Sequence, residues 1–147
     1  TRVETMATDE KISKALKSAA TYLENSVRAL NKKDGNSLMD SVWHLAAELE
    51  YALFMFSMAL EDEKDKPKWR SNPRLKKIGV GSVLVVVQDL LKEVDKHMKE
   101  ENLLEAYKKT DVARRYVLKV QRDFARKKRE ALKAKMKATP PRKPSSP

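Results

Sequence analysis

The sequence lacks or is poor in several residue types on which many functional sites depend. Its 147 residues include no Cys, three Gly and two His. Without Cys there is no disulfide framework, no thiolate zinc site and no cysteine nucleophile. The scarcity of Gly argues against an all-β fold and against a glycine-rich phosphate loop. The longest uncharged run is the eleven residues Ile78–Gln88, whereas a membrane-spanning helix needs about 20 apolar residues. The first ten residues mix acidic and polar residues, which is not the pattern of a signal peptide.

The two histidines give little support for catalysis or metal binding. His44 has Glu48 one helical turn later, and His97 has Glu93 one turn earlier. Helical di-metal proteins need Glu-x-x-His on two helices, and position 41 is Ser. Both histidines are therefore interpreted as structural or surface residues. We expect no enzymatic activity, no cofactor and no metal.

The charge of the chain is unevenly distributed. Lys and Arg number 32 against 21 Asp and Glu, which gives a net charge of +11. Residues 1–104 carry 17 residues of each sign, so the whole excess lies in residues 105–147. This division predicts a neutral body followed by a segment that binds a polyanion. High charge with no Cys and only two Gln also suggests adaptation to heat.

Apolar periodicity predicts an all-α chain that folds as a four-helix bundle. Steps of three and four residues indicate helices over about 9–31, 36–62, 78–98 and 103–138, with Thr8 as the first N-cap. Residues 80–87 could also be interpreted as a buried strand, but the helical pattern continues to Met98. Thr139–Pro147 is rich in Pro and basic, so it is predicted to be extended.

The fourth predicted helix has the most specific charge pattern. Seven cations recur at steps of three and four residues and therefore share one helical face, opposite an apolar stripe that ends near Phe124. We call this set the basic row: Arg115, Lys119, Arg122, Arg126, Arg129, Lys133 and Lys137. Six further cations widen the surface: Arg114, Lys127, Lys128, Lys135, Arg142 and Lys143.

The basic row favours binding to the phosphates of a nucleic acid. It spans 22 residue steps from Arg115 to Lys137, or about 33 Å of helix, and duplex DNA carries one phosphate charge per about 1.7 Å of its axis. Asn and Gln are scarce there, so no base reading is expected. Two other interpretations remain: binding to an acidic protein or membrane surface, and a solvated basic face. Solvated faces usually interleave Glu with Lys, whereas Val112–Pro147 holds only Asp123 and Glu130.

The connection between the second and third predicted helices is a second candidate nucleic-acid site. Pro67 and Pro73 interrupt helix there. The cations and the indole of this segment could contact phosphates and bases, or Trp69 could simply cover the end of the bundle. The residues concerned are Lys66, Lys68, Trp69, Arg70, Arg74, Lys76 and Lys77.

The second predicted helix is apolar on all sides over residues 51–60, which indicates burial against another subunit. We expect its oligomer interface to include Tyr51, Phe54, Met55 and Met58.

A neutral helical body, an apolar interface and a basic extension together resemble the major coat proteins of filamentous archaeal viruses. The resemblance is one of architecture, without a shared motif. It implies a homo- or heterodimeric repeat that wraps double-stranded DNA into a nucleoprotein filament in a virion. The DNA would be held by residues 115–143, with 66–77 as a second candidate. In that family the basic extension is often N-terminal, whereas here it is C-terminal. A cellular chromatin or RNA-binding protein in the cytoplasm or nucleoid, or a helical interaction module, remains the alternative.

Overall fold

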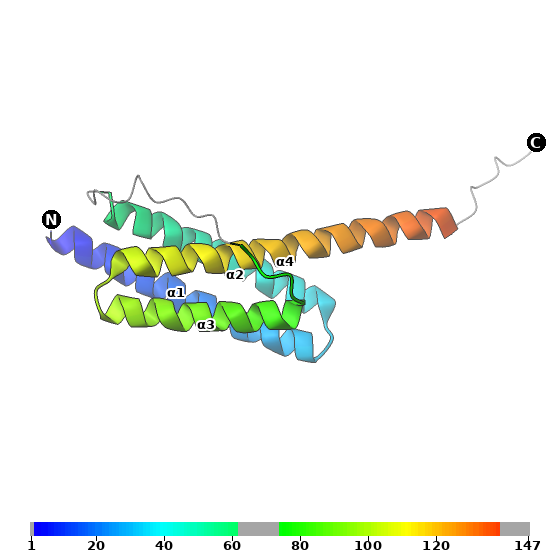
Figure 1. Ribbon diagram of the computed structural model, residues 1–147, viewed down its shortest axis with the longest axis horizontal. Coiled ribbons are helices and arrows are strands. Elements are labelled where there is room, and N and C mark those ends of the chain that lie inside the picture. The colour runs from blue at the N-terminus through cyan, green and yellow to red at the C-terminus, as the bar shows by residue number, and fades with distance from the viewer. Residues whose placement is uncertain (1, 62–73, 139–147) are drawn as a thin grey trace, which may run out of the picture.

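The computed structural model describes residues 2–61 and 74–138, and all secondary structure in this part of the chain is helical. Two helical hairpins form a bundle from which the last helix projects (Figure 1). The helices are α1 (Arg2–Asn31), α2 (Gly35–Ala59), α3 (Val80–Lys99) and α4 (Leu103–Ala138). The prediction of an all-α chain with four helices is confirmed for these residues.

Two details of the predicted helices are corrected, and one alternative is resolved. Thr8 is not an N-cap, because α1 begins six residues earlier at Arg2. The second helix ends at Ala59 instead of residue 62. Residues 80–87 are helical, as the helical pattern predicted, and the alternative strand interpretation is wrong. The fourth helix has the predicted bounds, and the predicted extended tail lies outside the described residues.

The two hairpins turn in the same way. Lys33 and Glu101 both have φ of 57°, in the left-handed region that usually favours glycine. The next residue in each turn donates its backbone N–H to a carbonyl five residues back, at 2.9 Å from Asp34 to Ala29 and at 2.8 Å from Asn102 to His97. Asp34 then caps α2, accepting the Ser37 backbone N–H at 3.1 Å. In each of the two hairpins, a left-handed residue followed by a capping residue therefore reverses the direction of the chain.

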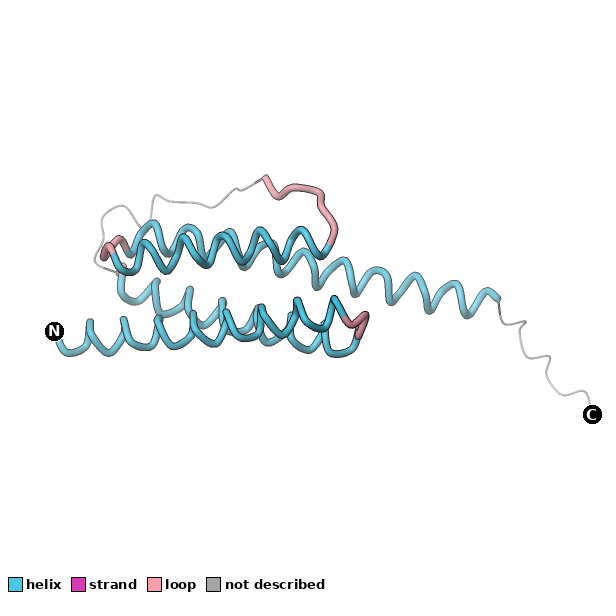
Figure 2. The backbone as a smooth tube through the Cα atoms, turned by 90° about the horizontal axis from the view of Figure 1, so that it is seen from below, coloured by secondary structure: helices cyan, strands magenta, loops and turns pink. Residues whose placement is uncertain are grey.

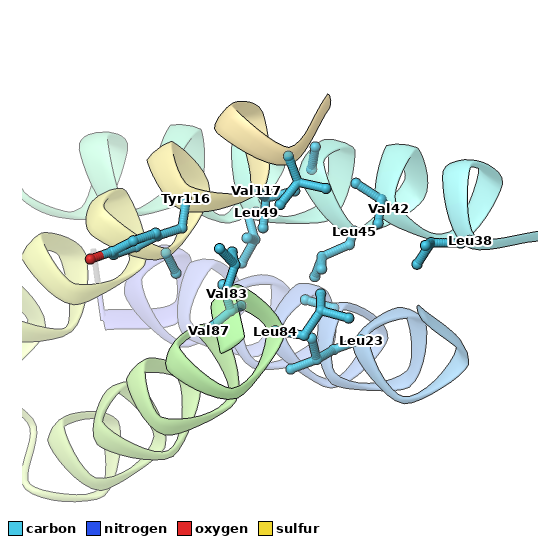
Figure 3. Close-up of a cluster of buried hydrophobic side chains, with 14 of the residues drawn as sticks. Leu23, Leu38, Val42, Leu45, Leu49, Val83, Leu84, Val87, Tyr116 and Val117 are labelled. Atoms are coloured by element: carbon cyan, nitrogen blue, oxygen red, sulfur yellow. The ribbon is translucent and has the colours of Figure 1, made fainter. Parts of the chain in front are cut away.

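The core runs the length of the bundle in two clusters. The larger one joins all four helices around fully buried residues such as Leu45, Leu49 and Val87 (Figure 3). The smaller one lies toward the other end and includes Ile12 and Phe56. These residues belong to the apolar stripes that the sequence predicts.

The packing leaves one edge of the bundle open. α1 packs along α2, α3 along α4, and α2 against α4, while α1 and α3 make far fewer contacts. A groove of about 1200 Å³ lies between α1 and α3. Its wall includes Leu16 and Leu91, and Asp9 and Glu101 lie at one end.

Candidate nucleic-acid interface

The helix α4 has two parts with different surroundings. From Ala106 to Val120 it contributes buried residues to the core, including Ala113 and Val117. From residue 125 to residue 137 every side chain is exposed. We call residues 125–137 the arm. It extends past the ends of the other three helices in two views of the molecule (Figures 1 and 2). The boundary falls just after Phe124, where the apolar stripe ends in the sequence.

The arm is strongly basic. Seven of its 13 residues are Lys or Arg, and Glu130 is its one acidic residue. At about 1.5 Å per residue the arm is about 20 Å long. No other described helix packs against the arm, so its cations project around the whole circumference of the helix.

The basic row changes character along its length. Near the bundle its cations are held within the chain. Arg115 Nε donates to Asp111 Oδ2 at 2.9 Å, and Lys119 Nζ donates to the carbonyl of Lys76 at 3.0 Å. Further along, Arg126 lies 3.6 Å from Asp123. The outer members, among them Arg129, Lys133 and Lys137, form no ion pair with another described residue. The part of the row on the arm is therefore the part most available to a polyanion.

The structure brings part of the second predicted site against the first. The segment 74–79 crosses α4 (Figure 1). It is fixed there because the Lys76 backbone N–H donates to Tyr116 Oη at 3.2 Å, next to the Lys119 bond. Arg74, Lys76 and Lys77 are thus placed beside the bundle end of the basic row. The sequence alone could not predict that these cations lie beside the basic row, since the two groups are about 40 residues apart in the chain.

Four residues of the second predicted site lie outside the described part of the chain: Lys66, Lys68, Trp69 and Arg70. The same is true of Arg142 and Lys143. Arg114, predicted to widen the basic surface, contacts α2 instead, with its guanidinium 3.6 Å from Glu50. Lys127, Lys128 and Lys135 are exposed on the arm.

The predicted oligomer interface needs one correction and one addition. Met55 is 5% exposed and belongs to the smaller core cluster, so it is not available to a partner. Tyr51, Phe54 and Met58 are exposed. Trp43 lies on the same face of α2 and is also exposed. Its position was recognisable from its spacing of eight and eleven residues from Tyr51 and Phe54.

Neither histidine joins a cluster of metal ligands. His44 stacks on Tyr22 with ring centroids 4.9 Å apart and has Asp40, not Glu48, at 3.6 Å. His97 lies 3.9 Å from Glu100. In the described residues no three of the side chains that commonly bind metals gather at one place. No described helix is long and apolar enough to cross a membrane.

Two carboxyl groups have shifted pKa values. Partial burial, together with the nearby charge of Glu101, raises the pKa of Asp9. Hydrogen bonds from Ser37 lower the pKa of Asp34. Both groups lie far along the chain from the arm.

Comparison of the chain with protein-family models, with curated proteins and with solved structures gave no match.

Proposed function

We propose that this protein is a non-enzymatic structural protein that binds double-stranded DNA through its phosphates and coats it without reading its sequence. The observation that carries the proposal is the arm. It is a helix with every side chain exposed, and it projects from the bundle with seven cations and one acid.

The chemistry of the arm favours phosphates over bases. Residues 125–137 contain no Asn or Gln, the side chains that pair with adenine in the major groove. Lys and Arg at steps of three and four residues instead match the closely spaced charges of a duplex backbone. Each contact releases condensed counterions, which makes binding strong at low salt and independent of sequence.

The distribution of charge and apolar surface supports a coat. The first 104 residues have no net charge, so neighbouring bodies do not repel one another strongly. Exposed Trp43, Tyr51, Phe54 and Met58 give α2 a surface for contacts between subunits. As a coat protein the chain would be a virion component. A cellular protein that binds DNA or RNA would use the same arm but would not need regular assembly.

Electron microscopy with and without double-stranded DNA tests the coat directly. We expect filaments of fixed pitch with DNA. Dispersed binding to DNA and RNA alike would contradict the coat and favour the cellular alternative.

Fluorescence anisotropy tests the mode of binding. Two duplexes of unrelated sequence should bind with the same affinity. With about 8–10 phosphate contacts, the slope of log K against log salt should be about −7 to −9. A slope shallower than about −3 would reject the basic row as the contact. A chain that ends at Phe124 should lose binding while keeping the melting temperature of the body, because the deleted arm makes no part of the core.

A further inference from the structure

The exposed apolar side chains fall into two groups. Seven large hydrophobic residues are exposed in the described part of the chain. Four lie on α2 and two on the arm, and the remaining one is Val85 on α3. Such grouping on a charged protein marks surfaces that contact a partner.

The α2 group forms a continuous face, which we call the α2 patch. Its members are Trp43 (62% exposed), Tyr51 (45%), Phe54 (62%) and Met58 (51%). Their spacing places them on one side of the helix over about 22 Å. The patch has aromatic residues at its centre, as the core of a protein interface does.

The surroundings of the α2 patch are acidic. From Asp34 to Glu61 the chain has five acidic residues and no Lys or Arg. Asp40 is 75% exposed and Glu50 is 69% exposed, and both lie on the outer side of α2. Arg114 of α4 lies 3.6 Å from Glu50, whereas Asp40 has no Lys or Arg partner among the described residues. The patch is therefore an apolar surface with acidic residues at its edges and no cation on its own helix, which suits an apolar and basic partner.

The arm has the complementary chemistry. Leu132 is 53% exposed and Met136 is 76% exposed. They are four residues apart and thus share one face, with Lys128 one turn before them. They lie beside the basic row rather than on it, so the row can face phosphates while these residues face a protein.

We infer that the arm of one copy docks on the α2 patch of a second copy. A chain cannot fill its own patch, because α4 is one continuous helix whose arm leads away from the bundle (Figure 2). Leu132 and Met136 contact the aromatic residues, and Lys128 on the same side of the arm lies near the acidic edge of the patch. The two surfaces differ, so the contact is head-to-tail. Repeated from copy to copy, it gives a ring or an open filament, and reciprocal exchange of arms between two copies gives a closed dimer.

The inference concerns assembly of the protein alone and is tested without nucleic acid. Its failure would leave phosphate binding by the basic row intact, and failure of DNA binding would leave this contact intact. Sedimentation velocity on the full chain at low salt is the measurement. We expect concentration-dependent association into a dimer or larger species, and a monomer at about 100 μM would overturn the inference.

Two variants block opposite sides of the contact. F54K places a cation on the patch, and L132E combined with M136E places acids on the arm. Each should weaken self-association by about 30-fold or more. All three positions are exposed, so circular dichroism and melting should match the unmodified chain. V85K is the matched control, and it should assemble normally. Assembly that V85K abolishes, or that the arm variant leaves unchanged, would refute the contact.

Mixing the two blocked variants gives the decisive result. The intact arm of F54K can dock on the intact α2 patch of the arm variant, while the reverse contact is blocked. The mixture should therefore form a dimer and nothing larger. A symmetric α2-to-α2 dimer predicts no such rescue, so a mixture that stays monomeric would overturn the inference.

Discussion

Four cations of the basic row can be removed from the arm without touching the core. Arg126, Arg129, Lys133 and Lys137 are all exposed. Replacing all four by Gln keeps good helix formers at each position. The helical content and melting temperature should therefore stay close to those of the unmodified chain, and any change in DNA binding reports on charge alone.

The expected loss follows from counterion release. Each phosphate contact contributes about 0.9 to the slope of log K against log salt on B-DNA, so four contacts contribute about 3.6. We expect the slope to change from about −8 to about −4.5, and the affinity at 0.1 M salt to fall by about 10³ to 10⁴-fold. Fluorescence anisotropy on a labelled duplex over a salt series gives both quantities.

A matched control separates position from net charge. Lys11, Lys14, Lys92 and Lys96 are exposed on α1 and α3, away from the arm. Changing these four to Gln lowers the net charge by the same amount. The control should keep a slope within about one unit of the unmodified chain. Equal losses in both variants would show that binding depends on total charge, which would refute the role assigned to the basic row.

Three further predictions test the fold around the site. Tyr116→Phe removes the acceptor of the Lys76 N–H and should cost about 1 kcal/mol in urea unfolding, while speeding amide exchange in residues 74–79; unchanged exchange would show that the segment is held in another way. Leu45→Ala empties a fully buried site and should cost about 2–5 kcal/mol, and a loss below about 1 kcal/mol would place Leu45 outside the core. Glu101→Gly relieves a left-handed backbone position and should stabilise the chain by about 0.5–1 kcal/mol, as should Lys33→Gly in the other hairpin. Glu101→Gly alone should also lower the pKa of Asp9, measured by NMR, because Glu101 contributes to raising it. Since that pKa is raised in the folded state, the unmodified chain loses stability as pH rises through it, and this loss should be smaller in Glu101→Gly than in Lys33→Gly.

Helical periodicity predicted the four helices because each one buries a single apolar side. Ile12, Leu45 and Val117 all lie where a step of three or four residues places them in the core. Helix ends were less predictable. Thr8 has a capping side chain, but the residues before it also tolerate helix, so α1 begins at Arg2.

The candidate site was predictable in its charge and not in its contacts. The basic row is a pattern within a single helix, so it can be recognised from the spacing of its cations in the sequence. The bond from Lys119 to Lys76 and the placement of Met55 in the core depend on how helices pack. On an almost wholly apolar stretch of α2, periodicity alone could not separate buried Met55 from exposed Phe54 and Met58.

The open edge between α1 and α3 has a mechanical consequence. The α1–α2 hairpin and the α3–α4 hairpin are joined mainly where α2 packs against α4. At one end of the open edge, a Cβ on Gly81 of α3 would lie 3.4 Å from the Leu30 side chain of α1, so the two helices come close there. Further along, the groove separates α1 from α3. A small rotation of one hairpin about the line where α2 meets α4 therefore widens or narrows the groove without breaking the core contacts between α2 and α4. The softest collective motion of the bundle should be this hinge, and its amplitude should be greatest where Asp9 faces Glu101.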